Sequence, residues 1–252
     1  NTFRYLLGNL NDNFEEIDVE KINLSDLPEL EQFMLHKIYS LNKNFKNYFN
    51  NYDFHNLYKE LLNFCTVDLS AFYFDIRKDS LYCDSKDSKK RQSTIILLNV
   101  ILNSLLRWFA PILSFTTEEI YRLIMNDNKS IHLSKFLDFP ISFKNENLNQ
   151  KWLELIKIRN ICNISIEEKR ASKEIGSSLE ASLKINLDKK LNDISKDVDF
   201  SELCITSIAE VSYLENSETK VQTTKAEGSK CQVCWKITKD ACSRKTCPKH
   251  TE

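Results

Sequence analysis

The chain has 252 residues and a formal net charge of −1, with 42% hydrophobic and 28% charged residues. This length is enough for two domains, or for one large domain with an appendage. The near-neutral charge excludes a uniformly basic nucleic-acid coat, and no apolar run approaches the roughly 20 residues that a membrane-spanning helix needs. The sequence opens at Asn1, without an initiator Met and inside an expected helix. We therefore expect a piece of a longer protein that has no membrane segment here.

The first part of the chain has the periodicity of helices. Apolar residues recur at helical spacing between Phe3 and Leu10, which predicts a first helix. The run 26–29 (DLPE) resembles an N-cap at Asp26, with Pro in the first turn and Glu at the capping-box position. We expect the next helix to run from Glu29 past residue 49, and a further helix over 55–64.

A strongly apolar segment follows at 93–109, with hydrophobic residues nearly all round. Such a segment is typical of a central buried helix, and Pro111 is expected to end it. The run 116–119 (TTEE) predicts a capping box that opens a helix through residue 124. Carboxylates at a helix start favour the helix dipole, so capping is preferred over an acid–base pair of Glu118 and Glu119. Residues 1–145 are thus predicted to form a helix bundle.

The pattern changes after residue 145. One long charged helix is expected over 152–175, ended by Gly176 as the residue after the C-cap. Residues 179–187 alternate strictly between apolar and polar, which predicts a half-buried strand. A short helix over 188–198 and a second strand within 203–214 complete a small α/β domain, residues 146–225. The expected fold class is therefore mainly α, with this small α/β domain and a C-terminal zinc finger over 226–252.

The C-terminal tail holds half of the eight cysteines in two clusters. Cys231 and Cys234 form a Cys-x-x-Cys pair, and Cys242, Cys247 and His250 follow. Four sulfurs, or three sulfurs and one imidazole nitrogen, make a closed site for one structural zinc ion, which folds a segment with almost no apolar core. A disulfide pair is disfavoured by this clustering. The other four cysteines are isolated, as expected of reduced thiols in a cytoplasmic protein: Cys65, Cys83, Cys162 and Cys204.

The remaining candidate residues favour packing over chemistry. Three histidines have no partner at ligand spacing: His36, His55 and His132. Trp108 and Trp152 lie on apolar helix faces and are expected in the core. The chain has no phosphate-binding glycine loop, Ser/His/Asp set or nucleophile elbow, so we expect no catalytic residue in it.

Trp235 directly follows a proposed metal ligand. It either covers the zinc site and packs on the adjoining domain, or provides a stacking platform for the bases of single-stranded RNA. Lys230, Lys236 and Lys239 lie close by in the sequence and would suit phosphates. The sequence pattern leaves both interpretations open.

Several strings resemble the C-terminal third of bacterial isoleucyl-tRNA synthetases, in the same order. They are NTFRYLLGNL (1–10), LPEL (27–30), SAFYFDIRKD (70–79), LY (81–82), APILSFTTEEI (110–120), Lys173 with IGSSLEA (175–181), and AEG, KC and CW at 226–228, 230–231 and 234–235. Several are shared with the valyl and leucyl relatives, whereas the terminal Cys-x-x-Cys-Trp points to isoleucine.

The resemblance implies an anticodon-binding helix bundle, a junction domain and a terminal zinc finger of a class I enzyme. Such an enzyme activates isoleucine with ATP and esterifies it to tRNA-Ile. The catalytic domain, which uses ATP and magnesium, and the editing domain would lie upstream in the same protein. This segment would bind the anticodon stem-loop and position the tRNA, as part of a cytoplasmic monomer.

One departure from the family pattern concerns the second cysteine pair, which is usually Cys-x-x-Cys with Arg before the last Cys. Here Cys242-Ser243-Arg244 begins that phrase, but Cys247 comes two residues late. The metal ligands are either Cys231, Cys234, Cys242 and Cys247, or a set with His250 in place of Cys242. The Cys-x-Arg match favours Cys242.

Two other functions were weighed. A freestanding zinc-containing interaction module would not bind tRNA. A DNA glycosylase of the formamidopyrimidine type also ends in a zinc finger, but it needs an N-terminal Pro and a β-sandwich, and this chain begins Asn1-Thr2-Phe3 within an expected helix.

Overall fold

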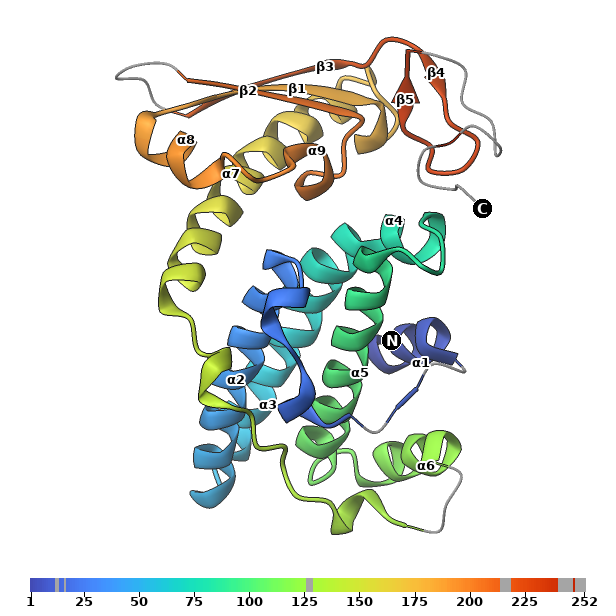
Figure 1. Cartoon of the computed structure of the whole chain (residues 1–252), viewed down its shortest axis with the longest axis vertical. Coiled ribbons are helices and arrows are strands. Elements are labelled where there is room, and N and C mark those ends of the chain that lie inside the picture. The colour runs from blue at the N-terminus through green and yellow to red at the C-terminus, as the bar shows by residue number, and fades with distance from the viewer. Residues whose placement is uncertain (12–13, 16, 126–128, 214–218, 240–246, 248–252) are drawn as a thin grey trace. The chain divides into compact units, whose positions relative to one another are not determined.

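The computed structural model describes residues 1–11, 14–15, 17–125, 129–213, 219–239 and 247. The chain divides into two compact units (Figure 1): unit 1 holds residues 1–81 and 86–145, and unit 2 holds residues 82–85 and 146–252. Helices dominate the described residues, and a small sheet lies in unit 2. The expected fold class, mainly α with a small α/β part, is confirmed. The division into three domains stays a prediction.

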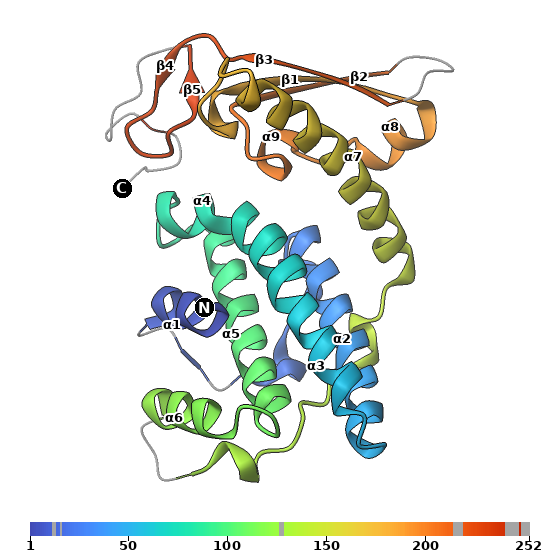
Figure 2. The same ribbon diagram turned by 180° about the vertical axis from the view of Figure 1, so that it is seen from behind.

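Unit 1 is a bundle of helices, in which α2 and α5 lie side by side (Figure 2). Its elements are α1 (Thr2–Leu10), η2 (Val19–Lys21), η3 (Leu24–Asp26), α2 (Glu29–Asn50), α3 (Phe54–Asn63), the π-helical η4 (Phe64–Phe74), α4 (Asp75–Cys83), α5 (Lys89–Phe109), α6 (Ser114–Met125), η5 (Ile131–Leu133) and η6 (Ile141–Phe143). The predicted helices at 3–10, 29–49, 55–64 and 93–109 are all present. The π-helix η4 was not expected, because its apolar residues show no period that separates it from an α-helix.

Helix α5 is the centre of the bundle, as its apolar composition predicts. Its residues from Leu97 to Phe109 are all buried, and burying one such side chain stabilises the fold by roughly 1.5–3 kcal/mol. Trp108 is fully buried as expected, with its ring 4.9 Å from that of Phe45. Its indole N–H donates to Asn42 Oδ1 at 2.9 Å, so the one polar atom of the ring is satisfied in the core.

A buried ion pair joins α2 to α4. Arg77 donates from Nε to Glu31 Oε1 at 2.6 Å and from Nη2 to Glu31 Oε2 at 2.7 Å, a bidentate arrangement. Tyr73 donates its hydroxyl to the same Glu31 Oε1 at 3.0 Å. Burial raises the pKa of Tyr73 well above its ordinary value, so the hydroxyl remains a donor. Three ionisable side chains thus form one hydrogen-bonded set in the bundle core.

Two predicted helix caps in unit 1 are wrong, although α2 does begin at Glu29 as expected. Asp26 does not cap α2, because it ends the short η3 and accepts from Asn23 Nδ2. The residue before Pro28 is held extended, with Leu27 at φ −96 and ψ 139, as proline requires of its predecessor, so Pro28 itself stands at the N-cap. Helix α6 begins at Ser114, before the expected capping box, and its Thr117 hydroxyl donates to Leu113 O at 3.0 Å within the helix.

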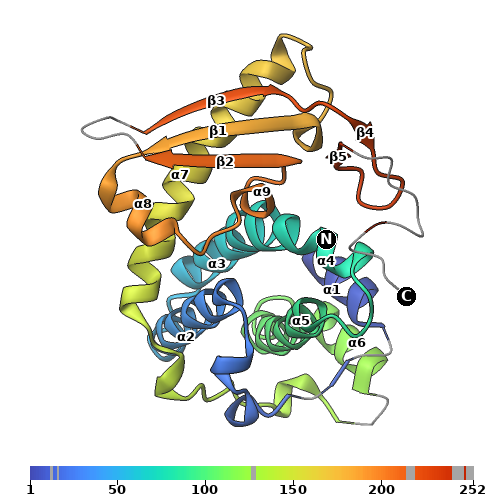
Figure 3. The same ribbon diagram turned by 45° about the horizontal axis from the view of Figure 1, so that its top comes forward.

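Unit 2 builds a three-stranded sheet against a long helix (Figure 3). Its elements are α7 (Glu146–Ala171), η7 (Ser178–Glu180), β1 (Ala181–Leu187), α8 (Lys189–Ser195), α9 (Phe200–Leu203), β2 (Ile208–Tyr213), β3 (Lys220–Lys225), β4 (Ser229–Lys230) and β5 (Ile237–Thr238). The sheet order is β2-β1-β3, with β1 parallel to β2 and antiparallel to β3. The two predicted strands and the helix between them are confirmed, whereas β3 was not expected.

The sheet packs one face on α7, as the alternation predicts. Leu183, Ile185 and Leu187 are fully buried, and Ser165 of α7 shares a 2.7 Å hydrogen bond with Thr223 of β3. Trp152 is buried in α7, as expected.

The predicted end of the long helix at Gly176 is wrong. Helix α7 ends at Ala171, and Lys173 takes the left-handed conformation with φ 61. Lys173 N and Glu174 N then donate to Arg170 O and Lys169 O at 3.0 and 3.1 Å, which closes the last turn. Helix α7 begins at Glu146, six residues before the expected start.

Candidate metal centre and RNA-binding surface

The C-terminal cysteines lie on a small hairpin that follows the sheet. Strands β4 and β5 pair Ser229 with Thr238 and Lys230 with Ile237. Gly228 enters this hairpin at φ 135, where a Cβ would lie 2.2 Å from Thr238 O. Only glycine fits this conformation and this approach of two backbone segments. The loop between the strands carries Cys231 and Cys234.

Three cysteine sulfurs converge beside this hairpin. The Sγ atoms of Cys231, Cys234 and Cys247 all lie within 4.8 Å of one another, and Cys231 Sγ is 3.6 Å from Cys247 Sγ. Zinc–sulfur bonds of about 2.3 Å in a tetrahedron place two sulfurs about 3.8 Å apart, so these three thiols fit a metal ion. Cys242 and His250, the two alternatives for the fourth ligand, lie outside the described residues.

Backbone hydrogen bonds hold the loop that carries Cys231 and Cys234. Cys231 N donates to Lys236 O at 2.8 Å and closes the turn, while Val233 N donates to Cys231 Sγ at 3.3 Å. Burial raises the pKa of the Cys234 thiol to about 11. A bound cation would favour the thiolates that burial opposes.

The sequence analysis missed one member of this cluster. The last two residues of α4 and the two residues after it, 82–85, belong to unit 2 and not to unit 1 like the rest of that helix. Cys83 is buried together with Cys231, Cys234 and Cys247. Its Sγ lies 3.8 Å from Val233 O. Cys83 had been interpreted as an isolated core thiol, since its distance along the chain gives no signal of this proximity.

Trp235 stands next to the cysteines with its ring largely in solvent. Its side chain is 59% exposed and its backbone has φ 61, an uncommon conformation for a residue other than glycine. Lys230 Nζ lies 5.2 Å from the ring centroid, within cation–π range. Lys230 and Lys239 are exposed, and Lys236 is half-buried. The hairpin thus presents an aromatic ring and several cations together.

A single hydroxyl ties the hairpin to the sheet. Ser207 Oγ accepts from Ile237 N of β5 at 2.6 Å and donates to Leu179 O. Ala226 N donates to Glu180 O at 2.7 Å just before the hairpin. These bonds fix the orientation of a segment that has little apolar core of its own.

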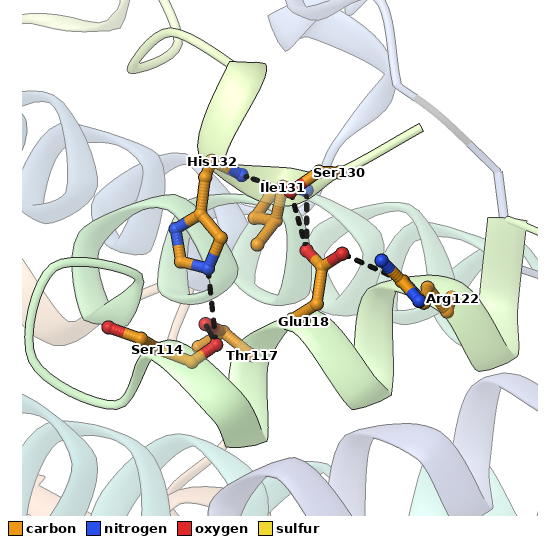
Figure 4. A network of polar contacts seen from close by, with 7 residues as sticks. All are labelled: Ser114, Thr117, Glu118, Arg122, Ser130, Ile131 and His132. Atoms are coloured by element: carbon orange, nitrogen blue, oxygen red, sulfur yellow. Dashed lines mark hydrogen bonds and ion pairs between the residues drawn. The ribbon is translucent and has the colours of Figure 1, made fainter. Parts of the chain in front are cut away.

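The other candidate groups have structural roles. Glu118 accepts from Ser130 Oγ at 2.8 Å, from Ile131 N at 3.1 Å and from Arg122 Nε at 2.7 Å. Figure 4 marks these contacts with dashed lines. These bonds lower the pKa of Glu118, with the Ser130 hydroxyl as the largest cause. Its carboxylate therefore holds the η5 turn. Glu118 has this role in place of the capping role that the sequence suggested.

The histidines, likewise, show no metal-like grouping in the described residues. His132 Nε2 lies 3.2 Å from Ser114 O (Figure 4), and the buried His36 accepts from Asn145 N through Nδ1 at 2.9 Å. His55 is exposed. No helix of the described residues has the length and apolarity needed to cross a membrane.

A family model of the anticodon-binding domain of tRNA ligases matches residues 31–185, which is more than half of the chain. The chain belongs to this family. The match covers most of the helical bundle, α7 and β1. It therefore includes residues of both units, and the expected resemblance to an anticodon-binding domain is confirmed.

The chain is similar to curated isoleucine–tRNA ligases. That of Pelagibacter ubique (strain HTCC1062) is 68% identical over 244 residues, covering 97% of this chain and 27% of the relative. That of Agrobacterium fabrum is 39% identical over 252 residues, and that of Zymomonas mobilis 38% over 240. They are covered over 26% and 25% of their lengths, so the chain spans about a quarter of these enzymes.

Proposed function

We propose that this chain is the tRNA-Ile-binding portion of an isoleucine–tRNA ligase. The observation that carries this proposal is similarity to such ligases along nearly the whole chain, 97% of it in the Pelagibacter relative. Isoleucine activation with ATP and magnesium would take place in an upstream catalytic domain, beside an upstream editing domain. The bundle and the hairpin would hold the anticodon stem-loop, so that this portion contributes positioning and specificity. We expect the whole enzyme to be a cytoplasmic monomer.

Filter binding of the purified chain to tRNA-Ile and to tRNA-Met tests this function. We expect tRNA-Ile to bind more tightly, because the two tRNAs differ in the anticodon region that this domain family reads. Equal binding would contradict anticodon recognition by this segment. Binding of neither tRNA would favour the freestanding interaction module. The glycosylase alternative has no support, since a helical bundle stands where that family needs a β-sandwich.

The cysteine cluster is proposed to hold one structural zinc ion. Cys231, Cys234 and Cys247 supply three thiolates, and Cys242 is the preferred fourth ligand. Four protein ligands leave no open position for substrate or water, so zinc would stabilise the hairpin and take no part in bond chemistry.

Metal content distinguishes the two ligand sets. We expect Cys242→Ser to abolish stoichiometric zinc, measured by plasma mass spectrometry, while His250→Ala retains it. Full zinc in Cys242→Ser, with loss in His250→Ala, would reverse the assignment. Cys65→Ser is a matched control, because Cys65 is a buried thiol of unit 1 outside the cluster.

Trp235 is proposed to stack on an unpaired base of the tRNA, with Lys230, Lys236 and Lys239 near phosphates. Its 59% exposure supports this role, as does the neighbouring Lys230. Base stacking on an aromatic ring is worth about 1–3 kcal/mol, so Trp235→Ala should weaken tRNA binding about 5- to 150-fold, and Trp235→Phe less. Unchanged zinc content in both variants would separate this effect from damage to the metal site. Unchanged affinity of Trp235→Ala would contradict the stacking role.

A further inference from the structure

A pocket in unit 1 combines aromatic rings with cations. It has a volume of about 510 Å³, within the range of roughly 300–1,000 Å³ typical of small-ligand sites. Three chain segments meet there: the end of α2, the end of α5 and the η5 turn with the residues after it. We call it the α2–η5 pocket, and the residues of interest in its wall are Lys46, Phe49, Arg107, His132, Lys135 and Phe136.

The wall after η5 is held by buried side chains of the bundle. Arg107 donates from Nε to Lys135 O at 3.0 Å, and its Nη1 donates to Asn103 O at 2.9 Å. Asn42 Nδ2 donates to Leu137 O at 2.8 Å. These two contacts hold the backbone on both sides of Phe136.

The η5 turn is fixed by the Glu118 network (Figure 4). Glu118 accepts from Ser130 Oγ and Ile131 N, and His132 Nε2 lies against Ser114 O. Both Ile131 and His132 line the pocket. The turn is thus bound to α6 along its length, which makes this wall preorganised.

The chemistry of the α2–η5 pocket suits a flat anionic ligand. The rings of Phe49 and Phe136 lie 5.8 Å apart at 55°, and Phe49 is 41% exposed, so an aromatic face is accessible. Lys135 is exposed, and Lys46 pairs with Asp138. Within the described residues, the wall itself includes Lys46, Arg107 and Lys135 but no carboxylate.

A larger hollow of about 910 Å³ in the same unit lacks this character. It is lined by Glu15, Asp18 and Asp26 as well as by Lys21 and Lys89. Three carboxylates against two ammonium groups would repel a phosphate, and its wall contains no aromatic ring. The α2–η5 pocket is therefore the better site for a nucleotide.

We propose that the α2–η5 pocket binds one unpaired nucleotide of the bound RNA, with its base stacked on Phe136 or Phe49 and its phosphate near the exposed Lys135. The ligand class follows from the wall: aromatic faces accept any base, and lysine and arginine bind phosphate. This site would be a second RNA contact, separate in sequence from the cysteine hairpin. The inference rests on the proposed function, since it requires that the chain binds tRNA.

Equilibrium binding of the 252-residue chain to tRNA-Ile tests the pocket. We expect Phe136→Leu to weaken binding about tenfold, because it removes a stacking face, and Phe136→Tyr to preserve affinity. Lys135→Ala should lower the slope of log affinity against log salt by about 0.7–0.9, the loss of one phosphate contact. Two exposed residues outside the pocket serve as matched controls, Phe115→Leu and Lys59→Ala, and both should leave affinity and slope unchanged.

The outcomes separate the pocket from the function on which it rests. If the unaltered chain binds tRNA and Phe136→Leu and Lys135→Ala bind equally well, the pocket proposal is overturned and the proposed function stands. If the unaltered chain binds no tRNA, both fail.

Photo-crosslinking gives a second measurement that needs no variant. The unaltered chain is irradiated with 4-thiouridine-substituted tRNA-Ile, and crosslinked peptides are identified by mass spectrometry. We expect RNA adducts on the peptide that contains Lys135 and Phe136. Adducts elsewhere in the chain, with none on this peptide or on that of Phe49, would refute the pocket.

Discussion

Replacing Glu31 by Gln should destabilise the helical bundle more than any exposed charge substitution in this chain. The change keeps the shape of the side chain but removes its negative charge. Arg77, whose side chain is 4% exposed, would then remain buried beside a neutral amide. Tyr73 would lose its carboxylate acceptor. Both consequences leave a buried polar group less well paired.

The magnitude follows from these contacts. Removing one partner of a buried ion pair costs about 3–5 kcal/mol, because the remaining charge is uncompensated. By comparison, Tyr73→Phe removes the hydroxyl that donates to Glu31 and should cost about 1.5–3 kcal/mol, as expected for a bond to a charged group. The double variant Glu31→Leu with Arg77→Met should lose less free energy of unfolding than Glu31→Leu and Arg77→Met lose together as single variants.

The assay must report on unit 1 alone, since two compact units need not unfold together. Hydrogen–deuterium exchange of peptides from α5 meets this need, because α5 lies in the centre of the bundle. Faster exchange of these amides in the Glu31→Gln variant gives the loss in opening free energy.

Asp18→Asn is the control for Glu31→Gln. Asp18 pairs with Lys21, and the two side chains are 51% and 84% exposed, so exchange in α5 should not change. A Glu31→Gln variant that is as protected as the unaltered chain would refute the reasoning. If the destabilisation of the double variant equals the sum for Glu31→Leu and Arg77→Met alone, the energetic coupling between Glu31 and Arg77 is refuted.

Three further outcomes are expected. Gly228→Ala should abolish zinc binding, measured as metal content, because the new Cβ would lie 2.2 Å from Thr238 O at φ 135. Full zinc content would show that the backbone of the hairpin can adopt another conformation at this residue. The hydrogen bonds that Glu118 accepts lower its pKa below the ordinary value of about 4.5. They therefore stabilise the η5 turn fully at a pH above this value, and the stabilisation is lost as the pH falls through the lowered pKa. The Ile131 amide resonance should titrate with a midpoint below 4.5, and a higher midpoint would contradict the assignment. Burial raises the pKa of Cys65 to about 11, so iodoacetamide at pH 8 should modify it far more slowly in the folded chain than in urea; equal rates would refute this.

The elements that sequence predicted best are those with one strong periodicity. The apolar run 93–109 indicated a buried helix, and the alternation over 179–187 indicated a strand with one buried face. Strand β3 was missed because only Thr223 among its residues is buried, and a buried hydroxyl gives no hydrophobic signal. Its place in the sheet comes from pairing with β1, which is a long-range property.

Helix ends were less predictable, because several local signals compete for one position. Gly176 resembled a C-terminal stop, yet Lys173 takes the left-handed conformation and Gly176 N donates to Glu180 Oε2. Glu118 resembled a capping residue, yet its Oε2 accepts from a turn more than ten residues away. Such choices depend on tertiary contacts, which spacing alone does not reveal.

The candidate metal centre was predicted in part from spacing. The Cys-x-x-Cys pair and Cys247 do converge, because a tight turn places its two thiols together. The place of Cys83 in the cluster was not predictable, since it lies about 150 residues away along the chain. The α2–η5 pocket likewise draws Phe49, Arg107 and Phe136 from three distant segments.

The double use of the Ser207 hydroxyl makes metal affinity a property of the sheet as well. Because this one atom contacts both Leu179 O and Ile237 N, any free energy that couples metal binding to the order of the sheet acts equally in both directions. A substitution in the sheet that strains this hydroxyl would lower metal affinity without touching a ligand. Metal binding would in turn protect the sheet against unfolding by the same factor, so part of the stability of the sheet would depend on the metal ion.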